Sequence, residues 1–126
     1  MKTEFVTYEI ALELKELGFD EPCLAHYNSR ESYNLKIEMY SYLSHDKFYI
    51  SAPLYQQAFR WFREKHKLHS ATFWMEIDKS IYWNYRYSYL NDKSTESVNR
   101  SMVYFNTPEE AELECLKKLI EIVKVK

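Results

Sequence analysis

The sequence predicts an α+β fold, in which a mostly antiparallel sheet of four or five strands has about three helices packed on one face. Three segments carry apolar residues at helical spacing, and several others alternate apolar with polar residues as half-buried strands do. Two of the alternating segments are joined by a short polar loop, which is typical of an antiparallel pair. With 126 residues, the chain is expected to form one domain, residues 1–126.

The first helix is expected over residues 7–17. Thr7 is a good N-cap residue, and Gly18 stands where a glycine often follows the last helical turn. Three apolar residues between them follow the i, i+4, i+7 spacing of one helix face: Ile10, Leu14 and Leu17.

Two further helices are expected later in the chain. One starts near Ser51, has Pro53 in its first turn and reaches about residue 67. The other opens with a capping box at Thr107 and Glu110, and continues along a wide apolar arc to the end of the chain.

Strands are expected between these helices. Their ranges are residues 23–28, 35–40, 48–50, 71–77, 81–90 and 102–105. A three-residue loop at 78–80 would pair Met75 with Trp83 and Phe73 with Tyr85, so that the apolar sides of both strands lie together in the core.

This register defines the first candidate site, on the outer face of the hairpin. Trp74 would lie opposite Asn84, with Tyr82 and Arg86 beside them, and Arg86 could cross the indole ring in a cation–π contact. Trp, Tyr and Arg dominate binding hot spots. The alternative is that a loop or the 91–100 segment folds over Trp74, or that a dimer buries it.

Composition excludes several classes of site. The single glycine rules out G-x-G-x-x-G, the P-loop and G-x-S-x-G, which need two or more. A formal net charge of −2 argues against a general nucleic-acid or membrane-surface binder. With no signal peptide, no membrane-spanning run and only two cysteines, the expected location is the cytoplasm, and no cofactor is expected.

Other chemistry-bearing residues form weaker patterns. Cys23 and His26 could chelate zinc together with a second pair, His66 and His69, although such spacings arise often by chance. The run Ser44-His45-Asp46 cannot form a catalytic triad, because adjacent residues on one loop do not point at a common centre. Cys115 falls on the apolar arc of the last helix, which predicts a buried and unreactive thiol.

A basic helix face is the third candidate. Arg60, Arg63 and Lys67 lie together on the wheel of the second helix, and such a face can track nucleic-acid phosphates. It is more often the solvated side of an amphipathic helix, and Glu64 would pair with Arg60 at i, i+4.

Three stretches together resemble a family of small uncharacterised proteins of gut anaerobes and their phages. They are ALELKELGFDEPC at 11–23, LYQQAFRWFREKH at 54–66 and EAELECLKKLIEIVK at 110–124. The resemblance implies an accessory protein of a phage or mobile element in the cytoplasm of a bacterial host cell, with no activity or functional residues to carry over.

The leading hypothesis is therefore a small intracellular binding module that engages a protein or a nucleotide-type ligand through its aromatic sheet surface, without membrane association. A small metal-dependent hydrolase and a nucleic-acid binder are the alternatives.

Overall fold

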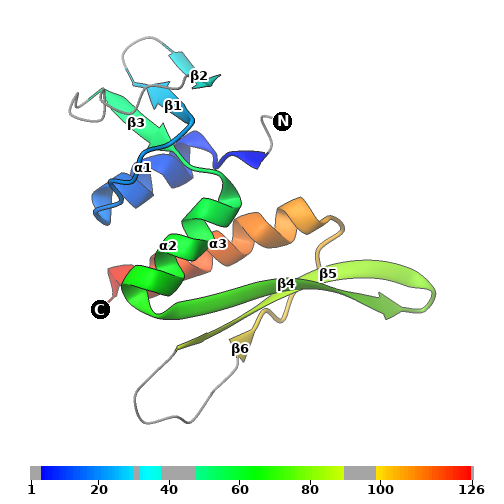
Figure 1. Ribbon diagram of the computed structural model, residues 1–126. Helices are drawn as coiled ribbons and strands as arrows, with labels where there is room; N and C mark the ends of the chain where they lie inside the picture. Colours follow the sequence, from blue (N-terminus) through cyan, green and yellow to red (C-terminus); the bar gives the residue numbers. More distant parts are fainter. Residues whose placement is uncertain (1–3, 30–31, 38–47, 90–98, 126) are drawn as a thin grey trace. The chain divides into compact units, whose positions relative to one another are not determined.

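The computed structural model describes residues 4–29, 32–37, 48–89 and 99–125 (Figure 1). Within these ranges the fold is α+β, as predicted, with three helices. The strands form two three-stranded antiparallel sheets rather than one sheet of four or five strands. The chain divides into two compact units, Met1–Ala58 and Phe59–Lys126, which are described in turn.

The first unit holds helix α1 (Tyr8–Glu16) and a sheet with the order β2-β1-β3. Its strands are β1 (Ala25–Asn28), β2 (Ser32–Ile37) and β3 (Tyr49–Ala52). In the central strand, His26 lies opposite Lys36 on one side and Ser51 on the other.

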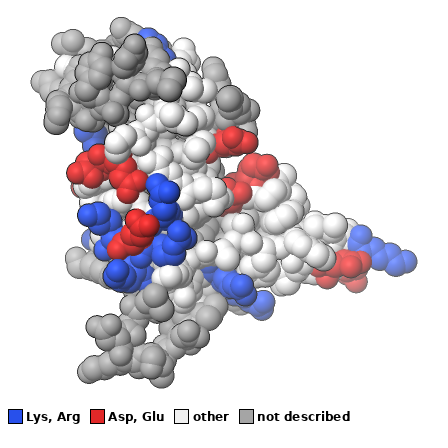
Figure 2. Space-filling view, in the orientation of Figure 1, with Lys and Arg blue, Asp and Glu red and all other residues white. Residues whose placement is uncertain are grey.

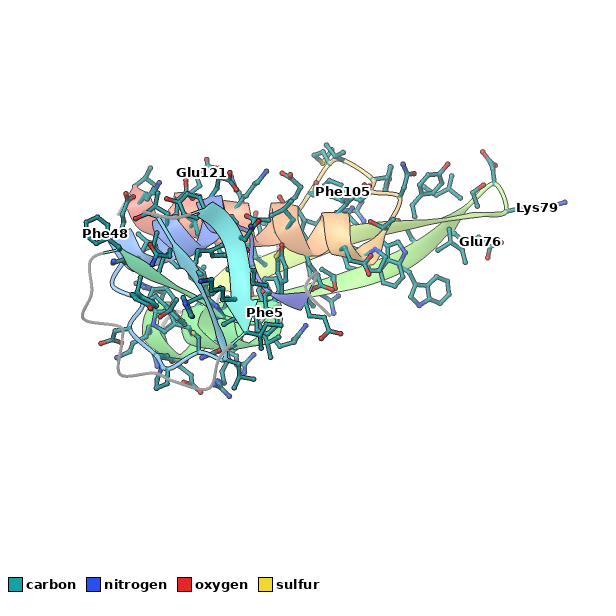
Figure 3. The ribbon with its side chains drawn as sticks, turned by 90° about the horizontal axis from the view of Figure 1, so that it is seen from above. Phe5, Phe48, Glu76, Lys79, Phe105 and Glu121 are labelled. Atoms are coloured by element: carbon teal, nitrogen blue, oxygen red, sulfur yellow. The ribbon has the colours of Figure 1, made fainter. Side chains whose placement is uncertain are left out.

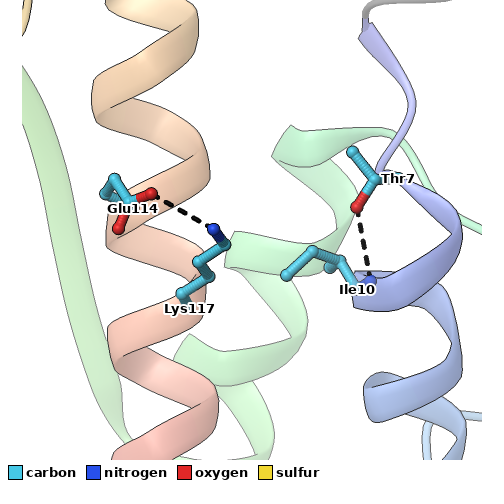
Figure 4. Close-up of polar contacts among 4 residues, drawn as sticks. All are labelled: Thr7, Ile10, Glu114 and Lys117. Carbon is cyan, nitrogen blue, oxygen red and sulfur yellow. Dashed lines mark hydrogen bonds and ion pairs between the residues drawn. The ribbon is translucent and has the colours of Figure 1, made fainter.

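Both ends of α1 are formed by the residues that the sequence singles out. The N–H of Ile10 donates to Oγ1 of Thr7 at 3.3 Å (Figure 4). At the other end Gly18 has a φ of +98°, a left-handed conformation that glycine adopts without steric cost.

The segments that flank α1 and β3 tie this unit together. The N–H of Val6 donates to the carbonyl of Pro53 at 3.0 Å, and Phe5 forms a β-bridge with Leu54. The hydroxyl of Tyr27 donates to the carbonyl of Val6 at 2.7 Å, and burial raises the pKa of Tyr27. A buried tyrosine thus finds the polar partner that its hydroxyl needs.

Helix α2 runs from Tyr55 to His66. The predicted start near Ser51 is wrong, because Ser51 and Ala52 are paired with β1 as the end of β3. Pro53 marks the change from strand to helix, since it can neither donate to a ladder nor continue one. The helix ends before Lys67, whose φ of 56° turns the chain sharply into the next strand.

The second unit contains a three-stranded sheet and helix α3 (Pro108–Lys124). The strands β4 (Leu68–Ile77) and β5 (Ser80–Tyr89) form a long hairpin, and β6 (Asn99–Arg100) pairs with β5. Figure 1 shows α3 lying along this hairpin, whose closed end extends past the start of the helix.

The predicted capping box opens α3. The N–H of Glu110 donates to Oγ1 of Thr107 at 3.2 Å, and a carboxylate oxygen of Glu110 accepts from the N–H of Asn106. Four apolar residues on the inner side of the helix are almost fully buried: Cys115, Leu116, Leu119 and Ile120. An exposed ion pair joins Lys117 and Glu114 at 3.2 Å on the outer side (Figure 4).

The predicted strand over residues 102–105 is largely wrong. Only Phe105 pairs there, and it exchanges two main-chain hydrogen bonds of 2.8 Å with Trp83. Between Arg86↔Arg100 and Trp83↔Phe105, the 100–105 segment has two residues more than β5. The surplus residues bulge outward, so Met102, Val103 and Tyr104 are exposed.

No helix in the described ranges combines the length and the apolar character needed to cross a membrane.

Candidate functional site: the aromatic surface of the β4–β5 hairpin

The turn of the hairpin decides which side chains share a face. Ile77 pairs with Ser80, so the loop contains two residues, Asp78 and Lys79, rather than the predicted three. Their φ values are 51° and 69°, the left-handed pair that a type I′ turn requires. Such a turn matches the twist of the flanking strands; aspartate is common at its first position, although glycine usually occupies the second.

The predicted register is therefore wrong by one residue. Trp74 lies opposite Trp83, whereas Asn84 lies opposite Phe73 and Tyr82 opposite Met75. Because directly paired residues point to the same side of a sheet, Trp74 projects from one face of the hairpin. Tyr82, Asn84 and Arg86 project from the other face, and the four residues do not form one patch.

The face that bears Trp74 is partly covered by α3. Tyr85 is buried and stacks on Phe105, with ring centroids 6.2 Å apart. Toward the turn, Trp74 is 62% exposed and Ile81 is 60% exposed. Figure 3 shows why: the end of the hairpin, marked by Glu76 and Lys79, projects beyond α3. We call Trp74 and Ile81 the tip patch.

The sequence left open whether Trp74 is exposed or covered by residues 91–100. Among the described residues nothing covers it, and residues 90–98 lie outside the described ranges. The exposure of Ile81 differs from the prediction, because its alternation with Trp83 and Tyr85 had assigned it to the core. The alternation of side chains along β5 correctly places these residues on one face, but the first turn of α3 does not extend as far as Ile81.

On the opposite face, Asn84 is only 1% exposed and has a structural role. Its Nδ2 donates to the carbonyl of Ser101 at 3.1 Å, and its Oδ1 accepts from the N–H of Tyr85 at 2.7 Å. These main-chain groups belong to the place where the 100–105 segment bulges away from β5. Asn84 therefore supplies the hydrogen bonds that a regular neighbouring strand would have supplied.

The other two members of the predicted patch also have neighbours on that face. The guanidinium of Arg86 lies 5.7 Å from the centre of the Phe73 ring, so its cation–π contact is with Phe73 and not with Trp74. The ring of Tyr82 lies 6.1 Å from that of Tyr104 on the bulge. Sequence reasoning missed the bulge residues because their apolar run reads as a strand.

The four predicted zinc ligands are divided between the units. Cys23 and His26 belong to the first unit, and His66 and His69 to the second. The ring of His26 packs on that of Tyr49, with centroids 4.6 Å apart, and the ring of His66 packs on that of Trp61, with centroids 4.9 Å apart. Within the described ranges, no three His, Cys, Asp or Glu residues are grouped as a metal site requires.

Both thiols are poor nucleophiles. Burial, reinforced by the charge of Glu21, raises the pKa of Cys23 to about 12. Burial also raises the pKa of Cys115 to about 12, against a smaller opposing effect of its hydrogen bond with Ser70. Because the thiolate is the reactive form, both cysteines remain protonated near neutrality. The sequence Ser44-His45-Asp46 lies outside the described residues.

The basic face of α2 carries mixed charge. Arg60, Arg63 and Lys67 are exposed, and so is Glu64 among them. The ammonium of Lys67 donates to the carbonyl of Glu64 at 3.3 Å. Figure 2 likewise shows carboxylate side chains interspersed among the basic ones on the face that it draws. A phosphate-binding surface would be more uniformly positive.

A pocket in the first unit was not anticipated from the sequence. It has a volume of about 450 Å³ and lies beside the end of α1, with Lys15, Asp20, Tyr49 and Ser51 among its lining residues. That volume suits a small molecule. The ammonium of Lys15 already donates to the carbonyl of Tyr49 at 3.0 Å, and the carboxylate of Asp20 carries the opposite charge in the same lining. These polar groups do not favour one class of ligand.

Comparison of the chain with protein-family models, with curated proteins and with solved structures finds no match. The resemblance to a family of gut anaerobes and their phages therefore stays a prediction, and the function is argued from the geometry alone.

Proposed function

We propose that this chain is a small binding module that acts in the bacterial cytoplasm and engages a protein partner through the end of its β4–β5 hairpin. The observation that carries the proposal is the tip patch, in which Trp74 and Ile81 expose 62% and 60% of their surface on one face. Both residues lie on regular, paired strands, so the apolar surface is presented on a defined backbone.

The composition of the surface supports a protein partner over a nucleic acid. Tryptophan is among the residues that contribute most to protein–protein binding, especially when it enters a pocket of the partner. Directly beside the patch, Glu76 is exposed and lies opposite Ile81, and its carboxylate would repel phosphate. A rim charge beside an apolar centre is the usual arrangement of a protein interface.

The proposal is tested by selecting binders from a displayed library of random peptides on the immobilised full-length chain. Affinities are then measured for the wild type, for Trp74→Ala and for Met102→Ala, which removes an even more exposed apolar side chain on the bulge. We expect Trp74→Ala to weaken binding by roughly 10-fold to 100-fold, the range of an anchor residue. Met102→Ala should bind as the wild type does.

Selected peptides that bind Trp74→Ala as tightly as the wild type would contradict the proposal. So would equal losses in Trp74→Ala and Met102→Ala, since binding would then follow exposed apolar area in general.

A further inference from the structure

The outer edge of β4 is a second exposed feature of the hairpin. In the sheet order β4-β5-β6, β4 is the outermost strand, and among the described strands it pairs only with β5. Trp83 directs both its main-chain groups to Phe105, away from β4. Since Trp74 lies opposite Trp83 in a pair without mutual hydrogen bonds, the N–H and carbonyl of Trp74 must also point outward, away from β5.

Along β4, the direction of the main-chain groups alternates between β5 and the outer edge from one residue to the next. The main-chain groups of Thr72 and Glu76 point outward too, as expected from their opposite partners, Tyr85 and Ile81. No described residue forms a hydrogen bond with these outward groups. The edge has no proline or bulge, two of the devices by which proteins prevent such a strand from pairing, and Glu76 is its one charged residue.

We propose that this edge pairs antiparallel with the β4 edge of a second copy of the chain, about a two-fold axis at Trp74. The inference rests on the proposed function and identifies the partner of the same surface. Trp74 would then lie opposite Trp74 of the second copy, and the outward groups of both strands would satisfy one another. A two-fold pairing of this kind is self-complementary and closed.

The distribution of charge is compatible with this register and disfavours two others. Centred on Trp74, the pairing sets the hydroxyl of Thr72 opposite the carboxylate of Glu76 of the second copy, a donor opposite an acceptor. Centred on Phe73, it would bring Lys79 toward Lys67 of the second copy. Centred on Glu76, it would bring two carboxylates together. Like charges directly opposite one another destabilise a strand pair.

Apolar side chains favour the same arrangement. Between Leu68 and Met75 the strand has no Asp, Glu, Lys or Arg, so Glu76 is the one charged residue of the paired segment from Thr72 to Glu76. On the face opposite Trp74, Phe73 would lie across from Met75 of the second copy. Aromatic and apolar cross-strand pairs of this kind stabilise sheets.

Residue-resolved amide hydrogen exchange of the full-length chain, at low and at high protein concentration, tests the proposal. We expect the amides of Thr72, Trp74 and Glu76 to exchange rapidly at low concentration and at least about 10-fold more slowly at high concentration. Phe73 and Met75, whose amides point to β5, should be protected at both. Sedimentation should show a monomer converting to a dimer over the same range.

Two substitutions at one position provide the matched control. Thr72→Pro removes an outward N–H without removing a β4–β5 hydrogen bond, so it should abolish the dimer. Thr72→Val keeps the N–H and the branched shape, so it should still dimerise. If Thr72→Pro does not fold, Trp74→Lys replaces it, because it places two ammonium groups opposite one another at the axis.

Dimerisation of Thr72→Pro, or a dimer whose outward β4 amides stay unprotected, would overturn the inference. A chain that remains monomeric at every concentration, yet binds selected peptides through Trp74, would overturn it and leave the proposed function standing. A monomeric chain whose peptide binding does not depend on Trp74 would overturn both the dimer and the proposed function.

Discussion

Replacing Asn84 with alanine tests whether this residue is structural, as the geometry indicates, or part of a binding surface, as the sequence suggested. The side chain is 1% exposed and forms two hydrogen bonds, to the carbonyl of Ser101 and from the N–H of Tyr85. Truncation leaves both main-chain groups without a partner. A buried group without a partner costs about 1–3 kcal/mol, and the carbonyl of Ser101 is only partly buried, so Asn84→Ala should lower the free energy of unfolding by about 1–4 kcal/mol.

Urea unfolding followed by far-UV circular dichroism measures this loss, and hydrogen exchange locates it. The amide of Tyr85, which donates to Asn84 at 2.7 Å, should exchange much faster in the variant. Arg86→Ala is the control, because Arg86 is exposed on the same face of the same strand, and it should change stability by less than about 1 kcal/mol. An Asn84→Ala protein within about 0.5 kcal/mol of the wild type, with the Tyr85 amide unchanged, would refute the structural role.

Three further predictions concern other residues. Burial raises the pKa of Cys115 from 9.0 to about 12, so the unfolded chain loses this proton at lower pH than the folded chain does. The protonated thiol therefore contributes fully to the free energy of unfolding below about pH 9, and this contribution is lost as the pH rises toward 12. Between these pH values, the free energy of unfolding should fall with pH about 1.4 kcal/mol per pH unit less steeply in Cys115→Ala than in the wild type. Equal slopes would contradict the burial of the thiol. Thr107→Ala removes the N-cap bond to the N–H of Glu110 and should cost about 1 kcal/mol in urea unfolding, whereas no loss would mean that the cap is not formed. Lys79→Gly relieves the positive φ of 69° in the turn and should raise the midpoint of thermal unfolding, and a lower midpoint would argue against a type I′ turn.

Local sequence signals predicted the helix ends well. Thr7, Gly18 and Thr107 act through hydrogen bonds and backbone angles within a few residues, so their neighbours alone determine what they do. The start of α2 was placed too early for the opposite reason. Ser51 and Ala52 are held in β3 by pairing with β1, more than twenty residues away in the chain, and no local pattern records that partner.

The hairpin shows how one local choice changes a candidate site. Alternation correctly indicated two strands and their two faces, but a loop of two or three residues decides which faces meet. Asp78 is a common first residue of a type I′ turn, but Lys79 occupies the second position, where glycine is the usual signal of a two-residue loop. The sequence therefore predicted the right strands and the wrong neighbours for Trp74, and the predicted four-residue patch depended entirely on those neighbours.

The same register explains why Trp74 and the β4 edge belong to one surface. A hairpin with a two-residue turn fixes Ile77 and Ser80 as a hydrogen-bonded pair, so every second residue back along β4 points its main-chain groups outward. Trp74 falls in this outward set, and its side chain lies where α3 no longer covers the sheet. An extended strand that docks on this edge would therefore gain main-chain hydrogen bonds and contact with an exposed indole at the same position.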